Sequence, residues 1–278
     1  MLSKQNPRIK LLRRLTTRRY REKEGKFLVE GVRFVEEALK SSFLVDMLVY
    51  CSEYTNTARG QALLETAAAN GTPVLEVDKE LFLELAATQT PQGLLAVVQW
   101  RPYTLATLRE VSQQALLVVV DAVLDPGNLG TIVRAADASG AGAVILLPGT
   151  VDILNPKALR ASMGSIFHIP VLRDCTAGEV NAFFKQQGIK LIAGVPRGGK
   201  PIYESDLTVP CAIIAGSEPR GPGEAILSGV VEKVCIPMPG LAESLNVAVS
   251  AAIMLYEAVR QRSFTKGPGL TDKTINGK

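Results

Sequence analysis

Short apolar runs alternate with helix-like patterns of apolar and polar positions along most of this chain. In the first hundred residues the strand-like runs are 27–29, 45–50, 74–77 and 94–98. The helix-like patterns between them are 31–39, 57–69 and 79–87. This alternation predicts a compact α/β unit.

In the second half the strand-like runs become almost unbroken in apolar residues: 116–120, 143–147, 190–195, 211–215 and 233–236. Such runs are typical of strands buried on both faces, as in a parallel sheet covered by helices. Helical patterns separate or follow them at 129–139, 157–163, 178–187, 223–227 and 246–262. Ser244 and Asn246 are both good N-cap residues, so the last helix is predicted to begin at one of them.

Arg101 and Pro102 interrupt the last strand of the first half, and a short helix is expected at 104–113. We therefore predict two domains, a smaller one at 1–104 and a larger parallel α/β domain at 105–278. The final helix, 246–262, carries apolar or small residues around much of its surface. A helix of that kind needs cover on more than one side, which favours a homodimer.

The N-terminal segment is strongly basic. Residues 1–33 hold eleven Lys or Arg and three Glu, a net +8 (11 − 3) in a chain whose total is +4. A helical pattern at 5–19 places Ile9, Leu12 and Leu15 on one side. The charge indicates an anionic partner, with nucleic acid first, and the alternative is a solvated charged helix. The candidate RNA-contacting residues are Arg13, Arg14, Arg18, Arg19 and Arg21.

Composition excludes several classes of protein. The 278 residues are 47% hydrophobic and 21% charged, and no apolar run approaches the length of a membrane span. The N-terminus lacks an apolar signal core, so we expect a cytoplasmic protein. Four scattered cysteines without a C-x-x-C pair and a single histidine, His168, predict neither a metal site nor a histidine-based triad.

Three loops follow apolar strands, at 121–130, 216–223 and 236–247. In open α/β sheets, ligands bind at the carboxyl ends of the strands. None of the loops matches G-x-G-x-x-G or G-x-x-x-x-G-K-[ST], which disfavours a Rossmann-type dehydrogenase or an ATP-driven enzyme. Taken alone, the third loop is also compatible with an ordinary strand–loop–helix connection.

The residues 126–136, 216–221 and 236–248 resemble, in order, the three motifs of the SpoU (TrmH-like) ribose 2′-O-methyltransferases. Residues 6–39, together with Pro91-Gln92-Gly93, resemble that family's substrate-binding domain, which is similar to ribosomal protein L30e. The resemblance implies a trefoil-knotted SPOUT domain in a dimer that methylates RNA with S-adenosylmethionine. One departure is Pro219, where the family often has glycine, because proline removes a backbone donor.

The resemblance also implies residue roles. The catalytic set is Asn128, Arg134, Glu218, Ser244 and Asn246, and the cofactor set is Gly216, Ser217, Ile236, Met238, Gly240 and Leu245. A guanidinium stays protonated, so we expect Arg134 to grip an RNA phosphate and stabilise developing charge. The alternative for Arg134 is a surface helix arginine. A separate substrate domain favours ribosomal (23S-type) over transfer RNA, and a non-catalytic RNA-binding or ribosome-assembly protein is the alternative function.

Overall fold

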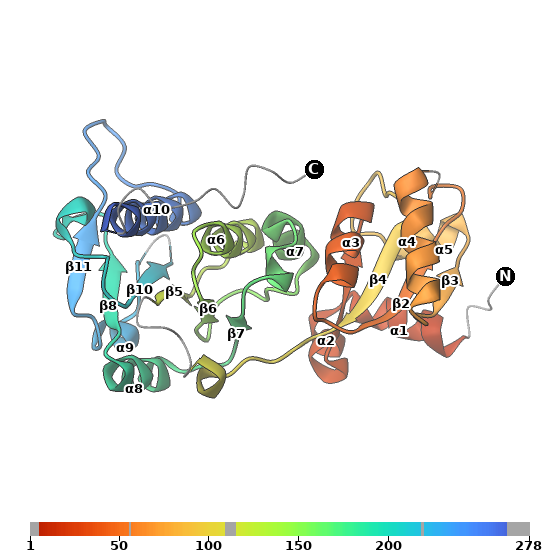
Figure 1. Ribbon diagram of the computed structural model, residues 1–278, viewed down its shortest axis with the longest axis horizontal. Coiled ribbons are helices and arrows are strands. Elements are labelled where there is room, and N and C mark those ends of the chain that lie inside the picture. The colour runs from red at the N-terminus through yellow and green to blue at the C-terminus, as the bar shows by residue number, and fades with distance from the viewer. Residues whose placement is uncertain (1–5, 56, 109–114, 218–219, 266–278) are drawn as a thin grey trace. The chain divides into compact units, whose positions relative to one another are not determined.

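The computed structural model describes residues 6–55, 57–108, 115–217 and 220–265 (Figure 1). These residues form two compact units. Unit 1 is drawn from Met1–Pro102 and Asp152–His168, and unit 2 from Tyr103–Val151 and Ile169–Lys278. The chain therefore leaves unit 2 after Val151, contributes seventeen residues to unit 1, and returns at Ile169. Sequence patterns gave no sign of this excursion, because the segment reads as one more loop and helix.

Unit 1 contains a four-stranded mixed sheet in the order β1 (Lys26–Glu30), β4 (Leu94–Gln99), β2 (Val45–Tyr50) and β3 (Val74–Glu76). The β2–β3 pair is parallel and the other pairs are antiparallel. Its helices are α1 (Pro7–Leu15), α2 (Arg18–Glu24), α3 (Val32–Lys40), α4 (Ala58–Ala69), α5 (Lys79–Leu85) and α7 (Pro156–Ser162). All four strands predicted from the apolar runs of this half are present.

The predicted basic helix at 5–19 is wrong as a single element. It ends at Leu15, Thr17 has extended backbone angles (φ −104°, ψ 142°), and α2 begins at Arg18. Ile9, Leu12 and Leu15 are nonetheless fully buried on one side of α1, as predicted. They belong to the core of unit 1, so the basic segment is an integral part of this unit.

Unit 2 is built on seven parallel strands in the order β7-β6-β5-β10-β8-β11-β9. Their bounds are β5 Leu116–Asp121, β6 Ala143–Leu146, β7 Val171–Leu172, β8 Lys190–Gly194, β9 Lys200–Pro201, β10 Cys211–Gly216 and β11 Glu232–Cys235. The central strands are buried along nearly their whole length, which confirms the predicted parallel sheet. Strands β7 and β9 were not predicted from the sequence, because a strand of two residues has no recognisable hydrophobic periodicity.

Helices cover both faces of this sheet (Figure 1). On one face, α6 (Pro126–Ala138) packs against α10 (Val247–Thr265), and α10 also packs against β10. On the other face, α8 (Ala177–Gln187) and α9 (Glu224–Leu227) enclose an apolar core with the strands. Short 3-10 turns occur in unit 2 at η1 (Leu105–Leu108) and η3 (Ile202–Glu204), and in unit 1 at η2 (Ser165–Phe167). Of the helix expected at 104–113, only the part up to residue 108 falls within the described residues. Among the helices described, none is long and apolar enough to cross a membrane.

Candidate functional site

The three loops singled out in the sequence follow β5, β10 and β11 of unit 2. Strand β10 lies between β5 and β8, with Gly216 opposite Asp121 at the carboxyl ends of the two strands. The Gly223 amide donates a hydrogen bond of 2.7 Å to Asp121 Oδ2, which ties the second loop to the end of β5. Asp121 was not among the site residues predicted from the sequence, although a carboxylate directly after a buried strand was the available signal.

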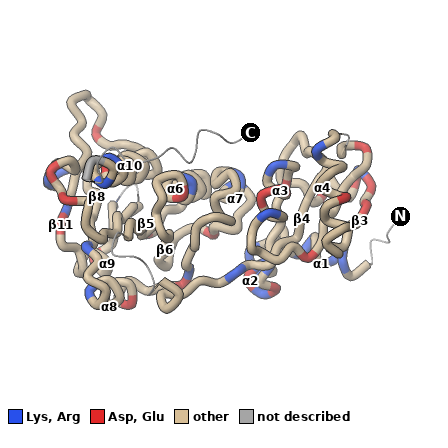
Figure 2. Tube along the Cα trace, viewed as in Figure 1, with Lys and Arg blue, Asp and Glu red and all other residues tan. Residues whose placement is uncertain are grey.

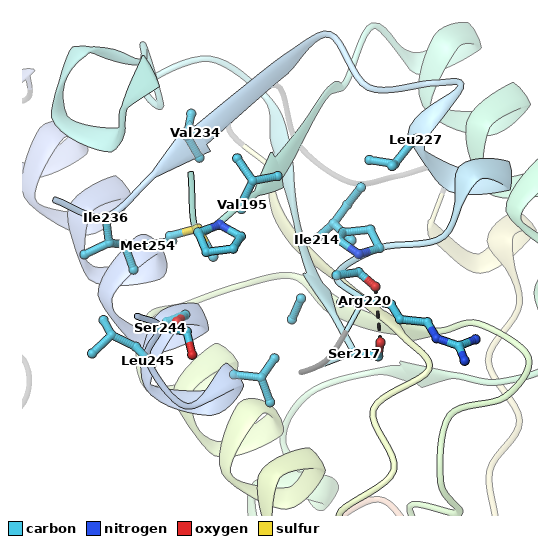
Figure 3. A pocket seen from close by; sticks show the side chains of 18 of the residues that line it. Val195, Ile214, Ser217, Arg220, Leu227, Val234, Ile236, Ser244, Leu245 and Met254 are labelled. Carbon is cyan, nitrogen blue, oxygen red and sulfur yellow. Dashed lines mark hydrogen bonds between the residues drawn. The ribbon is translucent and has the colours of Figure 1, made fainter. Parts of the chain in front are cut away.

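A pocket of about 310 Å³ opens beside these loops (Figure 3). Its lining includes five of the six residues assigned to the cofactor from the motifs: Gly216, Ser217, Ile236, Met238 and Leu245. Ser244, predicted as a catalytic residue, lines it as well. Gly240, the sixth cofactor residue, is exposed and is not part of the lining. Widely separated parts of the sequence therefore meet around one cavity.

The pocket also has walls that the motifs did not indicate. The end of β8 and the residues after it contribute Gly194, Val195 and Pro196, and α10 contributes Met254. Figure 3 shows Val195, Ile214, Val234 and Met254 around the same cavity. The available signal was the Pro and Gly content of 196–199 after a buried strand. The walls are largely apolar, with hydroxyl groups and Arg220 among them, which is typical of a small-molecule site.

Gly216 is required by close packing of the second loop. A Cβ at this position would lie 2.2 Å from Pro222 N and 2.4 Å from the carbonyl carbon of Gly221. The loop turns back sharply there: the Gly221 amide donates to Ser217 O over 2.8 Å, and the Ser217 hydroxyl donates to Gly221 O over 3.3 Å (Figure 3). The turn thus brings backbone groups to the edge of the pocket.

Two helix starts meet beside the pocket. Asn246 is the N-cap of α10, and its Oδ1 accepts from the amides of Ala248 (2.9 Å) and Val249 (3.3 Å). Its Nδ2 donates to Asn128 Oδ1 over 3.0 Å, across 118 positions of sequence. Asn128 lies in the first turn of α6, whose N-cap Asp125 accepts from the Asn128 amide over 2.9 Å. Two predicted catalytic residues are thereby brought into direct contact.

The remaining predicted catalytic residues are placed differently. Arg134 lies further along α6 with an exposed side chain, and it does not line the pocket. Glu218 and the neighbouring Pro219 lie outside the described residues, so their roles stay predictions. Arg220, which follows them, does line the pocket and was not predicted.

Arg21 requires a correction. Its side chain is 5% exposed, and its Nη2 donates to the buried carboxylate of Asp152 over 2.7 Å. Its Nη1 donates to the carbonyl oxygens of Leu15 and Thr16, where α1 ends. A guanidinium enclosed in this way holds unit 1 together and is not part of the exposed basic surface of α1 and α2.

The other four predicted RNA-contacting arginines lie on α1 and α2, where Arg13 is half-buried and the other three are exposed. Figure 2 shows the Lys and Arg positions along these helices. Arg13 makes a two-pronged ion pair with Glu84, and this hydrogen bonding raises the pKa of Arg13. Arg14 stacks over the Tyr20 ring at 5.3 Å, and Arg18 pairs with Glu22. Arg19 is exposed. These contacts leave charged groups accessible to a polyanion.

Metal-ligating residues do not gather in the described part of the chain: no three His, Cys, Asp or Glu side chains come close enough there to hold an ion. The cysteines are free thiols, and burial raises the pKa of Cys175 and of Cys211. His168 contacts Glu37 at 3.2 Å within unit 1.

Comparison with known proteins gives a consistent result over both halves of the chain. The model of the SpoU rRNA Methylase family matches residues 115–256, and that of the MRM3-like substrate binding domain matches residues 6–96. The 23S rRNA (guanosine(2553)-2′-O)-methyltransferase RlmP of Bacillus subtilis is 39% identical, covering 91% of this chain and 96% of that protein. The 23S rRNA (uridine(2479)-2′-O)-methyltransferase of Streptomyces viridochromogenes is 33% identical, with 89% and 87% covered. The crystal structure of the SpoU methyltransferase AviRb from that organism, in complex with AdoMet, has a TM-score of 0.83 at 32% identity and covers 93% of this chain and 100% of that one.

Proposed function

The chain belongs to the SpoU rRNA methylase family, and we propose that it transfers a methyl group from S-adenosylmethionine to a ribose 2′-hydroxyl of 23S ribosomal RNA. The observation that carries this proposal is the pocket of unit 2, where most of the motif residues assigned to the cofactor meet. A non-catalytic RNA-binding protein would have no need of such a pocket beside the joined helix starts of Asn128 and Asn246.

The residues of the pocket suit S-adenosylmethionine, which supplies an electrophilic methyl group on its sulfonium sulfur. Ile236 and Leu245 offer apolar walls for the adenine ring, and the hydroxyls of Ser217 and Ser244 offer hydrogen bonds to polar groups of the cofactor. The absence of a Cβ at Gly216 lets the second loop close tightly against the cavity.

Asn128 and Asn246 hold the starts of α6 and α10 together, and we assign them to positioning the reacting groups. Arg134 is exposed on α6, as a residue that grips the RNA must be. Its planar fork suits bidentate binding of phosphate and stabilisation of charge developing on the ribose oxygen. Its permanent charge makes it unsuitable as the general base. Glu218 and Ser244 complete the proposed catalytic set.

We assign RNA binding to the N-terminal domain, 1–104, and methyl transfer to the domain at 105–278, of which the segment Asp152–His168 belongs to unit 1. Support comes from the substrate-binding family model over residues 6–96 and from the exposed arginines of α1 and α2. Ribosomal RNA is favoured over transfer RNA because the two relatives described above are named for 23S rRNA. Free cysteines and the absence of a membrane-spanning helix in the described residues are consistent with our proposal of a cytoplasmic enzyme.

The proposed assembly is a homodimer. One side of α10 packs on α6 and the sheet, yet Val249 (46% exposed), Ile253 (38%) and Tyr256 (52%) form an apolar stripe on its outer side. Residues at this spacing share one helix face, and covering it with a second copy removes apolar surface from water. We also propose that the segment after β11 is threaded as a trefoil knot. Light scattering at micromolar concentration tests the dimer, and a monomeric mass contradicts it.

Two measurements test the function. Calorimetry with S-adenosylmethionine in excess chelator should show binding without metal, and no heat at millimolar cofactor would remove the enzyme from consideration. Mapping of 2′-O-methyl groups in total RNA, with and without the protein, should show one additional site in 23S rRNA. A new site in transfer RNA instead would retain the chemistry and change the substrate.

A further inference from the structure

Unit 1 contains a cavity of about 300 Å³ that the methyl-transfer chemistry does not use. Its volume lies at the lower end of small-ligand pockets, roughly 300–1,000 Å³. The walls come from the α1–α2 junction, β1, α3, the end of α5 and the inserted segment that carries α7. Leu15, Leu28 and Phe34 form apolar surface on one part of the wall, and Leu159 of α7 adds to it. The excursion of the chain into unit 1 therefore completes this cavity.

Four charged side chains also line the cavity: Arg21, Arg160, Glu30 and Glu84. The Nε of Arg21 and the Nη1 of Arg160 are buried and have no hydrogen-bond acceptor among the described residues. Native proteins rarely leave buried donors unpaired. Both oxygens of each carboxylate already accept hydrogen bonds, those of Glu30 from the Ala87 amide (2.6 Å) and the Thr88 hydroxyl, and those of Glu84 from Arg13. Each carboxylate oxygen has a further lone pair.

We propose that this cavity binds an unstacked guanine base of the substrate RNA; the proposal rests on the function given above. Two arginines and two glutamates add no net charge, so the lining does not favour a free phosphate. A base combines flat apolar faces with polar edges, and single-stranded RNA is recognised through such splayed bases. Guanine presents acceptors at O6 and N7 for arginine and N–H donors for a carboxylate. That set of groups matches the lining.

The first test fills the mouth of the cavity without changing charge. Ala87 lines the cavity and is exposed, so Ala87→Trp adds bulk there while the backbone amide still donates to Glu30. Ala69→Trp, at an exposed position of α4 that is not part of the lining, is the matched control. We expect Ala87→Trp to weaken binding of a 23S rRNA transcript about tenfold, and Ala69→Trp to leave it unchanged.

The salt dependence of binding separates a base contact from a phosphate contact. A base contact neutralises no phosphate, so losing it does not change the number of counterions released on RNA binding. The salt dependence of RNA binding by Ala87→Trp should therefore equal that of the wild type. Arg160→Gln, which removes one of the buried donors, should weaken binding in the same direction and serves as the second variant if Ala87→Trp does not fold. Wild-type RNA affinity in a folded variant of either kind would overturn the proposal.

The identity of the base is tested with mononucleotides as probes. Saturation-transfer NMR on the full chain, with S-adenosylhomocysteine filling the cofactor pocket, should show contact to the base protons of GMP. The contact should be weaker for AMP and UMP, and absent for GMP with Ala87→Trp. Equal contact for all three nucleotides, or displacement of GMP by inorganic phosphate, would overturn the assignment of guanine.

Failure of the inference and failure of the function are distinguishable. If the wild type methylates 23S rRNA and Ala87→Trp binds RNA normally, only the base pocket is refuted. If the wild type neither binds S-adenosylmethionine nor methylates RNA, the function is refuted, whereas the GMP experiment still reports on the cavity.

Discussion

The second loop leaves no room for a side chain at Gly216, and we therefore predict that Gly216→Ala disturbs the proposed cofactor site. The added Cβ would lie 2.2 Å from Pro222 N and 2.4 Å from the carbonyl carbon of Gly221. Real Cβ contacts essentially never fall below 3.0 Å, so the loop must withdraw by at least about 0.8 Å (3.0 − 2.2). Both obstructing atoms belong to the backbone, and a change of rotamer cannot relieve the clash.

That withdrawal strains the two hydrogen bonds that close the loop, from the Gly221 amide to Ser217 O (2.8 Å) and from the Gly223 amide to Asp121 Oδ2 (2.7 Å). Overpacking of this kind costs about 1–3 kcal/mol. Since the loop lines the proposed cofactor pocket, we expect affinity for S-adenosylmethionine to fall roughly five- to 140-fold, with tenfold for each 1.4 kcal/mol.

Calorimetric titration with S-adenosylmethionine measures the affinity, and a thermal melt measures stability. Gly178→Ala in the first turns of α8 is the control, because its Cβ would meet no atom within 4 Å. That variant should bind the cofactor normally and melt at the same temperature or slightly higher. Wild-type cofactor affinity in Gly216→Ala would refute the assignment of this loop to the cofactor.

Three further outcomes are expected. Arg134→Ala should lower the rate of single-turnover methyl transfer by roughly 10²–10³, with cofactor affinity retained. Arg134→Lys should be similarly inactive, because the point charge of an ammonium cannot replace the planar guanidinium. An active Lys variant would contradict this role. If Arg18 and Arg19 contact phosphate, Arg18→Gln and Arg19→Gln should each reduce the slope of log binding constant against log salt concentration by about 0.7–0.9. An unchanged slope would show that the residue is a solvated surface charge without a phosphate contact. Hydrogen bonds from Lys190 first, and from Ser205 and Lys200, hold the pKa of Glu232 at about 2. The ionised Glu232 therefore adds about 3 kcal/mol to the free energy of unfolding above pH 4.5, and this contribution is lost as the pH falls towards 2. Urea unfolding at several pH values should show a weaker pH dependence of stability for Glu232→Gln than for the wild type. Superimposable curves of stability against pH would refute this role.

Point substitutions test the basic segment more cleanly than a truncation would, because part of this segment lies in the core of unit 1. Deleting residues 1–21 would remove eight basic residues, but it would also remove Ile9, Leu12 and Leu15 from the core of unit 1. It would further leave the Asp152 carboxylate buried without Arg21, which is strongly destabilising. Loss of RNA binding after truncation would therefore report unfolding as readily as loss of contacts.

The elements whose stability is local were predictable from the sequence alone. Unbroken apolar runs identified β5 and β10, because a strand buried on both faces has no polar positions. Asn246 was one of two candidates for the start of α10, and its side chain does cap that helix. The order of the three motifs indicated the family, and five of the six residues that they assigned to the cofactor line the pocket of unit 2.

Contacts between distant segments were decided by the tertiary structure. No local pattern brings Asn128 to Asn246 or sends Asp152–His168 into unit 1, because both depend on where the sheet and its crossovers carry the chain. Arg21 shows the limit most clearly. In sequence it is one of eleven basic residues in 1–33, whereas in the fold it is a buried partner of Asp152, 131 positions away. Charge density along a chain predicts a polyanion-binding surface, but burial decides which of those charges can reach it.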